Sequence, residues 1–123
     1  MTTIQKTPRS IQRVLAFVNR VRVATGQKPL KSLKKGKPNN SSLCPIAASF
    51  NGLANVSGAT IEFSGLTGKQ FTKVCKDLGV PKDEVGDNVE FYEAYGHAEI
   101  DLPKFCVEFV DRFDKGRIPE LIA

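Results

Sequence analysis

Negative charge is absent from the first half of this 123-residue chain, because no Asp or Glu precedes Glu62. Ten basic residues lie before it: Lys6, Arg9, Arg13, Arg20, Arg22, Lys28, Lys31, Lys34, Lys35 and Lys37. The second half holds the other 8 basic residues and all 13 acids. Residues 1–61 therefore carry +10 and residues 62–123 carry −5, which together give the net charge of +5. A split this sharp predicts an anionic partner for the basic half.

Cysteine and histidine are also scarce. The three cysteines, Cys44, Cys75 and Cys106, are odd in number and far apart, a pattern that does not predict a disulfide framework. Zinc sites usually contain close pairs such as Cys-x-x-Cys, and neither the cysteines nor His97, the one histidine, form such a pair. We therefore expect no metal, no cofactor and no catalytic residues.

Long apolar runs are missing as well. No stretch reaches the length needed to span a bilayer, and the N-terminus lacks the apolar segment of a signal peptide. With three thiols expected to be reduced, these absences predict a cytoplasmic protein without a membrane partner.

The apolar residues predict an α+β fold in one small domain, residues 1–123, with three main helices packed on a small, mostly antiparallel sheet. The first helix begins near Thr7 and Pro8 and ends before Gly26. The other two follow Thr67-Gly68 and Asp101, and Asp101 is expected to cap its helix. The apolar stripes of the three helices are Ile11, Val14, Leu15, Val18 and Val21; Phe71, Val74, Cys75 and Leu78; and Phe105, Cys106, Phe109, Val110 and Phe113.

Shorter patterns predict the remaining elements. A short helix is expected to begin at Pro45, and residues 53–56 and 59–63 to form a β-hairpin. Residues 89–92 are expected to form a strand that returns through residues 95–100. Residues 27–43 form a loop in this prediction, held to the body by Leu30 and Leu33, and residues 118–122 close the chain as an apolar clip.

The candidate binding residues are basic side chains from three segments. At about 100° per residue, the three arginines of the first helix lie within roughly 40° of one another, opposite the apolar stripe. The loop adds five lysines, and the helix after Thr67 adds three more if it packs alongside. The full set is Arg9, Arg13, Arg20, Lys28, Lys31, Lys34, Lys35, Lys37, Lys69, Lys73 and Lys76. Arg22 projects into the apolar stripe, so either the helix ends there or the side chain extends out to solvent.

Several partners fit this basic surface. Lys and Arg can neutralise the phosphates of a nucleic acid without contacting bases. An acidic protein, self-association of basic half to acidic half, or the chain's own acidic half are alternatives, as is a merely solvated surface. Because Phe17 is the one aromatic residue among the first 49, a base-stacking platform for single strands is not expected.

Two more specific functions, a helix-turn-helix and a cysteine-dependent enzyme, have less support from the sequence. Residues 71–87 have the spacing of a helix-turn-helix, but the recognition helix would carry three acids and Gly86, so we expect a capped helix followed by a turn. Cys44 stands at a predicted helix N-terminus, which can lower the pKa of a thiol, and His97 could serve as its base. A cysteine-dependent enzyme is the least favoured function, because local packing or N-capping explains Cys44 as well.

Two short motifs suggest a family. They are Cys44-Pro45-Ile46-Ala47 after the lysine-rich loop and the ending Phe109-Val110-x-x-Phe113-Asp114-x-Gly116-x-x-Pro119-x-Leu121. With the N-terminal helix they cover roughly half the chain, and they resemble a group of small uncharacterised proteins from actinobacteria and their phages. The resemblance implies a phage-encoded protein in the host cytoplasm, where an interaction module would bind a host protein.

Overall fold

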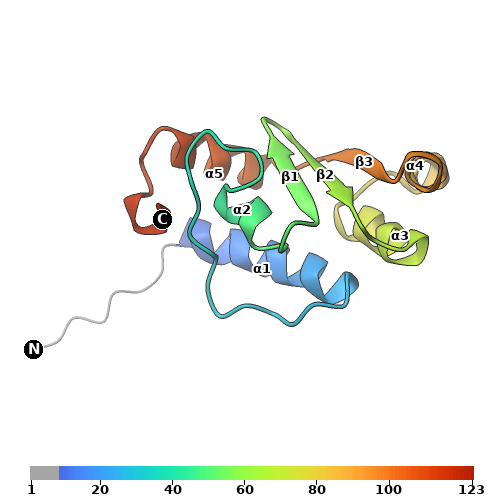
Figure 1. Ribbon diagram of the computed structural model, residues 1–123, viewed down its shortest axis with the longest axis horizontal. Helices are drawn as coiled ribbons and strands as arrows, with labels where there is room; N and C mark the ends of the chain where they lie inside the picture. Colours follow the sequence, from blue (N-terminus) through green and yellow to red (C-terminus); the bar gives the residue numbers. More distant parts are fainter. Residues whose placement is uncertain (1–8) are drawn as a thin grey trace, which may run out of the picture.

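The computed structural model describes residues 9–123, which form five α-helices, a three-stranded sheet and a final 3-10 turn (Figure 1). In chain order these are α1 Arg9–Ala24, α2 Pro45–Ala48, β1 Ala54–Ser57, β2 Thr60–Ser64, α3 Gly68–Asp77, α4 Lys82–Tyr95, β3 His97–Asp101, α5 Lys104–Asp114 and η1 Pro119–Leu121. The predicted α+β fold in one small domain is confirmed. The expected helix entry at Thr7 and Pro8 lies outside the described residues.

The sheet is antiparallel throughout, in the order β1-β2-β3. The predicted hairpin of β1 and β2 is confirmed, with Ala54 opposite Phe63 and the turn at Gly58 and Ala59. Side chains alternate along each strand, so one face is buried against the helices and the other is largely exposed. The sheet therefore has one face free for contacts.

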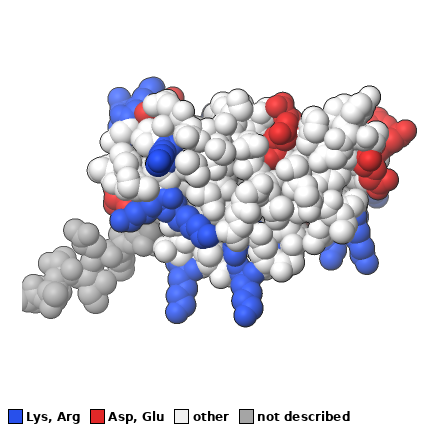
Figure 2. All heavy atoms as spheres, viewed as in Figure 1, with Lys and Arg blue, Asp and Glu red and all other residues white. Residues whose placement is uncertain are grey.

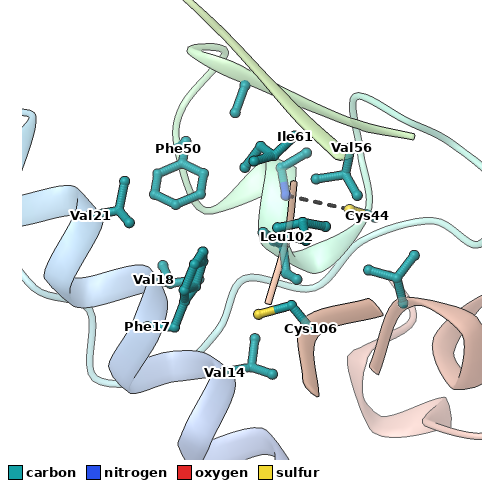
Figure 3. Close-up of a cluster of buried hydrophobic side chains, with 14 of the residues drawn as sticks. Val14, Phe17, Val18, Val21, Cys44, Phe50, Val56, Ile61, Leu102 and Cys106 are labelled. Atoms are coloured by element: carbon teal, nitrogen blue, oxygen red, sulfur yellow. Dashed lines mark hydrogen bonds between the residues drawn. The ribbon is translucent and has the colours of Figure 1, made fainter. Parts of the chain in front are cut away.

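The core lies between α1, α2, α5 and the buried face of the sheet. In Figure 3, Val14, Phe17 and Val18 of α1 point towards Cys106 of α5 and Leu102. These side chains are each at most 6 % exposed, and the apolar stripe predicted for α1 is buried apart from the half-buried Leu15. At the other end of the sheet, α3 packs on α4 through stacked rings of Phe71 and Tyr92 (4.2 Å between centroids).

The strand predicted at residues 89–92 is wrong, because this segment belongs to the helix α4. Val85, Val89 and Tyr92 turn inward at i, i+4 and i+7, which is helical spacing that a four-residue window cannot reveal. Gly86 is tolerated because it is exposed, and Gly96 at φ +78° ends the helix. Residues 9–123 thus contain four main helices rather than three.

Directly after α3 the sequence predicts only a turn, but in the structure a second helix, α4, follows that turn. The order helix, turn, helix is present, but α4 packs on β3, and its first turns expose Asp83, Glu84 and Asp87. Carboxylates repel phosphates, so the charge of α4 does not suit a recognition helix.

Asp101 does not cap α5, contrary to the prediction. It is the last residue of β3, and Leu102 continues the ladder by donating its N–H to the carbonyl of Ala59 (2.8 Å). The helix begins two residues later, behind Pro103 and without a side-chain cap. Thr67, in contrast, caps α3 and forms a capping box with Gln70, which was not predicted from the sequence.

The loop 27–43 is fixed to the body at several points. Leu33 is buried as predicted, whereas Leu30 is half-buried and is held by its backbone N–H, which donates to Asn19 Oδ1 (2.7 Å). Gly36 forms a parallel bridge with Ile122, in which its N–H donates to the Leu121 carbonyl (2.8 Å). The C-terminal clip therefore closes on the loop.

We predict opposite effects for two Gly→Ala changes. A Cβ at Gly36 would overlap the backbone of Leu43, Cys44 and Pro45, so Gly36→Ala should lower the free energy of unfolding by about 1–3 kcal/mol. Gly86→Ala adds a methyl group in open space within α4 and should raise it by about 0.5–1 kcal/mol. Urea unfolding of both variants checks this, and a loss for Gly86→Ala would contradict the helical assignment of α4.

Candidate anion-binding surface

The arginines predicted for one face of α1 lie there. Arg9, Arg13 and Arg20 are exposed, and the eleven residues from first to last place them along about 16 Å of helix. The Arg13 guanidinium lies 4.2 Å from the centre of the Phe105 ring in α5, a cation–π contact that holds it in place. The three arginines therefore form an exposed row on α1, in which the side chain of Arg13 has a fixed orientation.

Packing of α1 on α3 brings Arg20 together with Lys73 and Lys76. These three side chains line a shallow depression with a volume of about 480 Å³, together with Val23, Ala24 and Asp77. We call these six residues the basic hollow. Asp77 is the single acid in this lining, and Val23 adds an apolar side chain that is 60 % exposed.

The other predicted basic residues are exposed but more widely spread. Lys69 lies in the first turn of α3, and the loop carries Lys28, Lys31, Lys34, Lys35 and Lys37. Of these, Lys34 is tethered, since its Nζ donates to Asn51 Oδ1 (2.6 Å). Figure 2 shows basic side chains along the lower edge of the molecule, whereas acids gather at the α4 end. The structure thus joins three of the eleven predicted residues in one depression.

Internal ion pairs do not neutralise this surface. Within residues 9–123, the ion pairs that form join His97 to Glu62 (3.5 Å) and Lys115 to Asp111 (3.0 Å). Neither uses a basic residue of the first half. A direct hydrogen bond between the halves joins the Asn39 N–H to Asp114 (2.8 Å), but no base takes part in it. Within residues 9–123, the basic residues of the first half therefore form no ion pair with the acidic half.

Arg22 lies in the last turn of α1, as one of the two alternatives expected, and it does not extend to solvent, as the other alternative did. It is buried, 6 % exposed, and its Nε donates to the Lys28 carbonyl (2.8 Å). Its Nη1 donates to the carbonyl of Ser49, so the guanidinium ties α1 to the loop and to the end of α2. The position of a cation within an apolar stripe was the sequence signal for this structural role.

Cys44 caps α2, but its environment does not activate it. The Sγ atom accepts a hydrogen bond from the Ala47 N–H (3.4 Å), and the residue is 3 % exposed beside Val56 (Figure 3). Burial raises the pKa of this thiol, outweighing the lowering by the N–H groups of Ala47 and Ile46. His97 is instead exposed at the start of β3, next to Glu62. The N-capping and local packing favoured for Cys44 are therefore confirmed.

The buried thiols give a pH-dependent stability. Burial raises the pKa of Cys75 to about 11 and that of Cys106 to about 12. Between pH 9 and these values the unfolded chain loses thiol protons that the folded chain keeps, so the free energy of unfolding falls as pH rises. Each thiol should contribute up to about 1.4 kcal/mol per pH unit in that window. Urea unfolding from pH 8 to 10.5 should show a shallower decline for Cys106→Ala, and an unchanged decline would contradict this.

Neither metal ligation nor membrane insertion finds support in the described part of the chain. Within residues 9–123, no group of three or more His, Cys, Asp or Glu side chains is placed to hold a metal ion. No helix there combines the length and the apolar character needed to cross a bilayer.

The fold and this surface define a small α+β domain with an exposed basic face. No family model, curated protein or solved structure matches the chain. The resemblance to actinobacterial and phage proteins therefore stays a prediction.

Proposed function

We propose that this protein is a non-enzymatic binding protein that contacts a nucleic-acid backbone through α1, α3 and the loop 27–43. One observation supports this above all: Arg20, Lys73 and Lys76 converge on one depression, and no described acid forms an ion pair with them. A backbone anion would replace solvent counterions there, and the released ions would favour binding.

The composition of the surface favours phosphate contacts over base reading. The two large exposed aromatic residues of the described chain, Phe91 and Tyr95, belong to α4 and not to the basic segments. Base stacking needs exposed rings, and sequence-specific readout needs an element shaped for a groove. The interaction should therefore show little sequence preference.

A second candidate is an acidic protein partner, such as a host protein if the chain is phage-encoded. It is favoured by Val23, whose exposed side chain lies among the cations of the basic hollow. Protein interfaces bury apolar side chains at their centre and keep charges at the rim, an arrangement that a phosphate backbone does not require.

Fluorescence anisotropy with labelled DNA and RNA, double- and single-stranded, across a salt series tests the proposal. Backbone binding predicts an affinity that falls linearly in log–log form with salt, with a slope of about 0.9 for each phosphate contact on duplex DNA. No anisotropy change near physiological salt would contradict it and would favour the protein partner.

A further inference from the structure

An exposed aromatic patch lies on α4, on a different part of the molecule from the basic hollow. Phe91 is 48 % and Tyr95 is 66 % exposed, and their ring centroids are 4.6 Å apart. The ring of His97 meets Phe91 edge-on at 6.3 Å. Contiguous exposed rings of this kind mark interaction surfaces, because water solvates them poorly.

Carboxylates surround these rings. Glu62 and Glu99 line a depression of about 380 Å³ with Phe91 and His97, and Asp87 lies one helical turn before Phe91. We call the six residues Glu62, Asp87, Phe91, Tyr95, His97 and Glu99 the acidic aromatic patch.

Two of these carboxylates are placed unfavourably in the isolated molecule. Glu62 of β2 and Glu99 of β3 are directly opposite each other in the antiparallel register, on the exposed face of the sheet. Like charges at opposed positions destabilise a strand pair. An incoming cation would relieve this repulsion, and His97, 3.5 Å from Glu62, does so only when protonated.

The same chain carries a matching surface. The basic hollow combines exposed Val23 with Arg20, Lys73 and Lys76, so each surface places exposed apolar side chains beside charges opposite in sign to those of the other. Of the four large apolar side chains exposed in the described chain (Val23, Leu43, Phe91 and Tyr95), three lie in these two surfaces. Cations over aromatic faces would add cation–π attraction.

We propose that the basic hollow of one molecule docks on the acidic aromatic patch of a second copy, head to tail. The two surfaces lie on different elements, so the contact is heterologous and leaves one surface of each kind free at the ends. This goes beyond the proposed function, since it requires no nucleic acid. Both contacts use the basic hollow, so a nucleic acid and a second copy would compete for it.

Charge reversal on each side separately, followed by mixing, tests the contact. Sedimentation velocity of nucleic-acid-free protein should show an average mass that rises with concentration at 0.05 M salt and falls at 0.5 M salt. Lys73→Glu/Lys76→Glu and Asp87→Lys/Glu99→Lys, all at exposed positions, should each weaken association at least about tenfold. An equimolar mixture should associate again, because the intact hollow of one variant can then meet the intact patch of the other, and the reversed hollow can meet the reversed patch.

Two results would overturn the proposal. One is a wild-type protein that stays monomeric at low salt over the whole concentration range. The other is association that neither reversal weakens, or that mixing does not restore. Circular dichroism of each variant checks the fold. The variant Phe91→Ser/Tyr95→Ser removes the exposed rings without changing the net charge, and it should also stay monomeric. Phe91→Ser/Tyr95→Ser leaves both the basic hollow and the net charge unchanged, so its anisotropy titration tests nucleic-acid binding independently of association.

Discussion

Simultaneous replacement of Arg20, Lys73 and Lys76 by Ala should weaken binding to duplex DNA about a hundredfold at 0.1 M salt. These side chains surround one depression, so a single stretch of backbone can contact all three. Each lost phosphate contact should lower the slope of log affinity against log salt by about 0.9, so the triple variant should lose about 2.7 in total. The anisotropy salt series measures both quantities.

The matched control removes equal charge from residues outside the basic hollow. Lys82, Arg112 and Arg117 are exposed, and their triple Ala variant has the same net charge as the first. If binding depends on the basic hollow, this control should keep its slope and lose no more than about threefold in affinity through the overall field. Equal losses in the two variants would show that net charge, and not this surface, determines binding.

Arg22→Ala should lower the free energy of unfolding by about 2–4 kcal/mol, although the residue contacts no acid. The guanidinium donates to the carbonyls of Lys28 and Ser49, and its loss leaves two acceptors without a partner in a buried region. The side chain also fills space in the apolar stripe of α1, so a cavity adds to the loss. Urea unfolding monitored by circular dichroism measures the change.

Arg20→Ala is the control for this prediction, since it lies two residues earlier on the same helix and is exposed. Its effect on stability should stay within about 0.5 kcal/mol, while its effect on nucleic-acid binding should be the larger of the two. Similar stability losses for the two variants would contradict a structural role specific to Arg22.

The sequence predicted those elements whose signals are local and repeated. The stripes of α1, α3 and α5 extend over two or more turns, and Thr67 has a capping residue three positions on. The prediction failed for residues 82–95, because five acids obscure the apolar pattern of α4 and Gly86 lowers its helix propensity. Contacts of Val85 and Tyr92 with the rest of the fold stabilise this helix, and propensity does not include them.

The binding residues could be named from the sequence but not grouped. That Arg20, Lys73 and Lys76 share one depression depends on how α1 packs against α3, some fifty residues apart in the chain. The acidic aromatic patch was missed for the same reason: Glu62 and Glu99 become neighbours through strand register alone. A charge count finds an excess of one sign, but contacts decide where it is concentrated.

The attachment of the loop 27–43 has a consequence for synthesis of the protein. Asn39 bonds to Asp114, 75 residues later, and Gly36 pairs with Ile122. At about 5–20 residues per second, a ribosome needs about 4–15 s to add those 75 residues. During that interval the loop lysines have left the peptidyl-transferase centre, but the loop lacks these two C-terminal anchors. The nascent chain therefore presents its lysine-rich loop before the C-terminus can close on it.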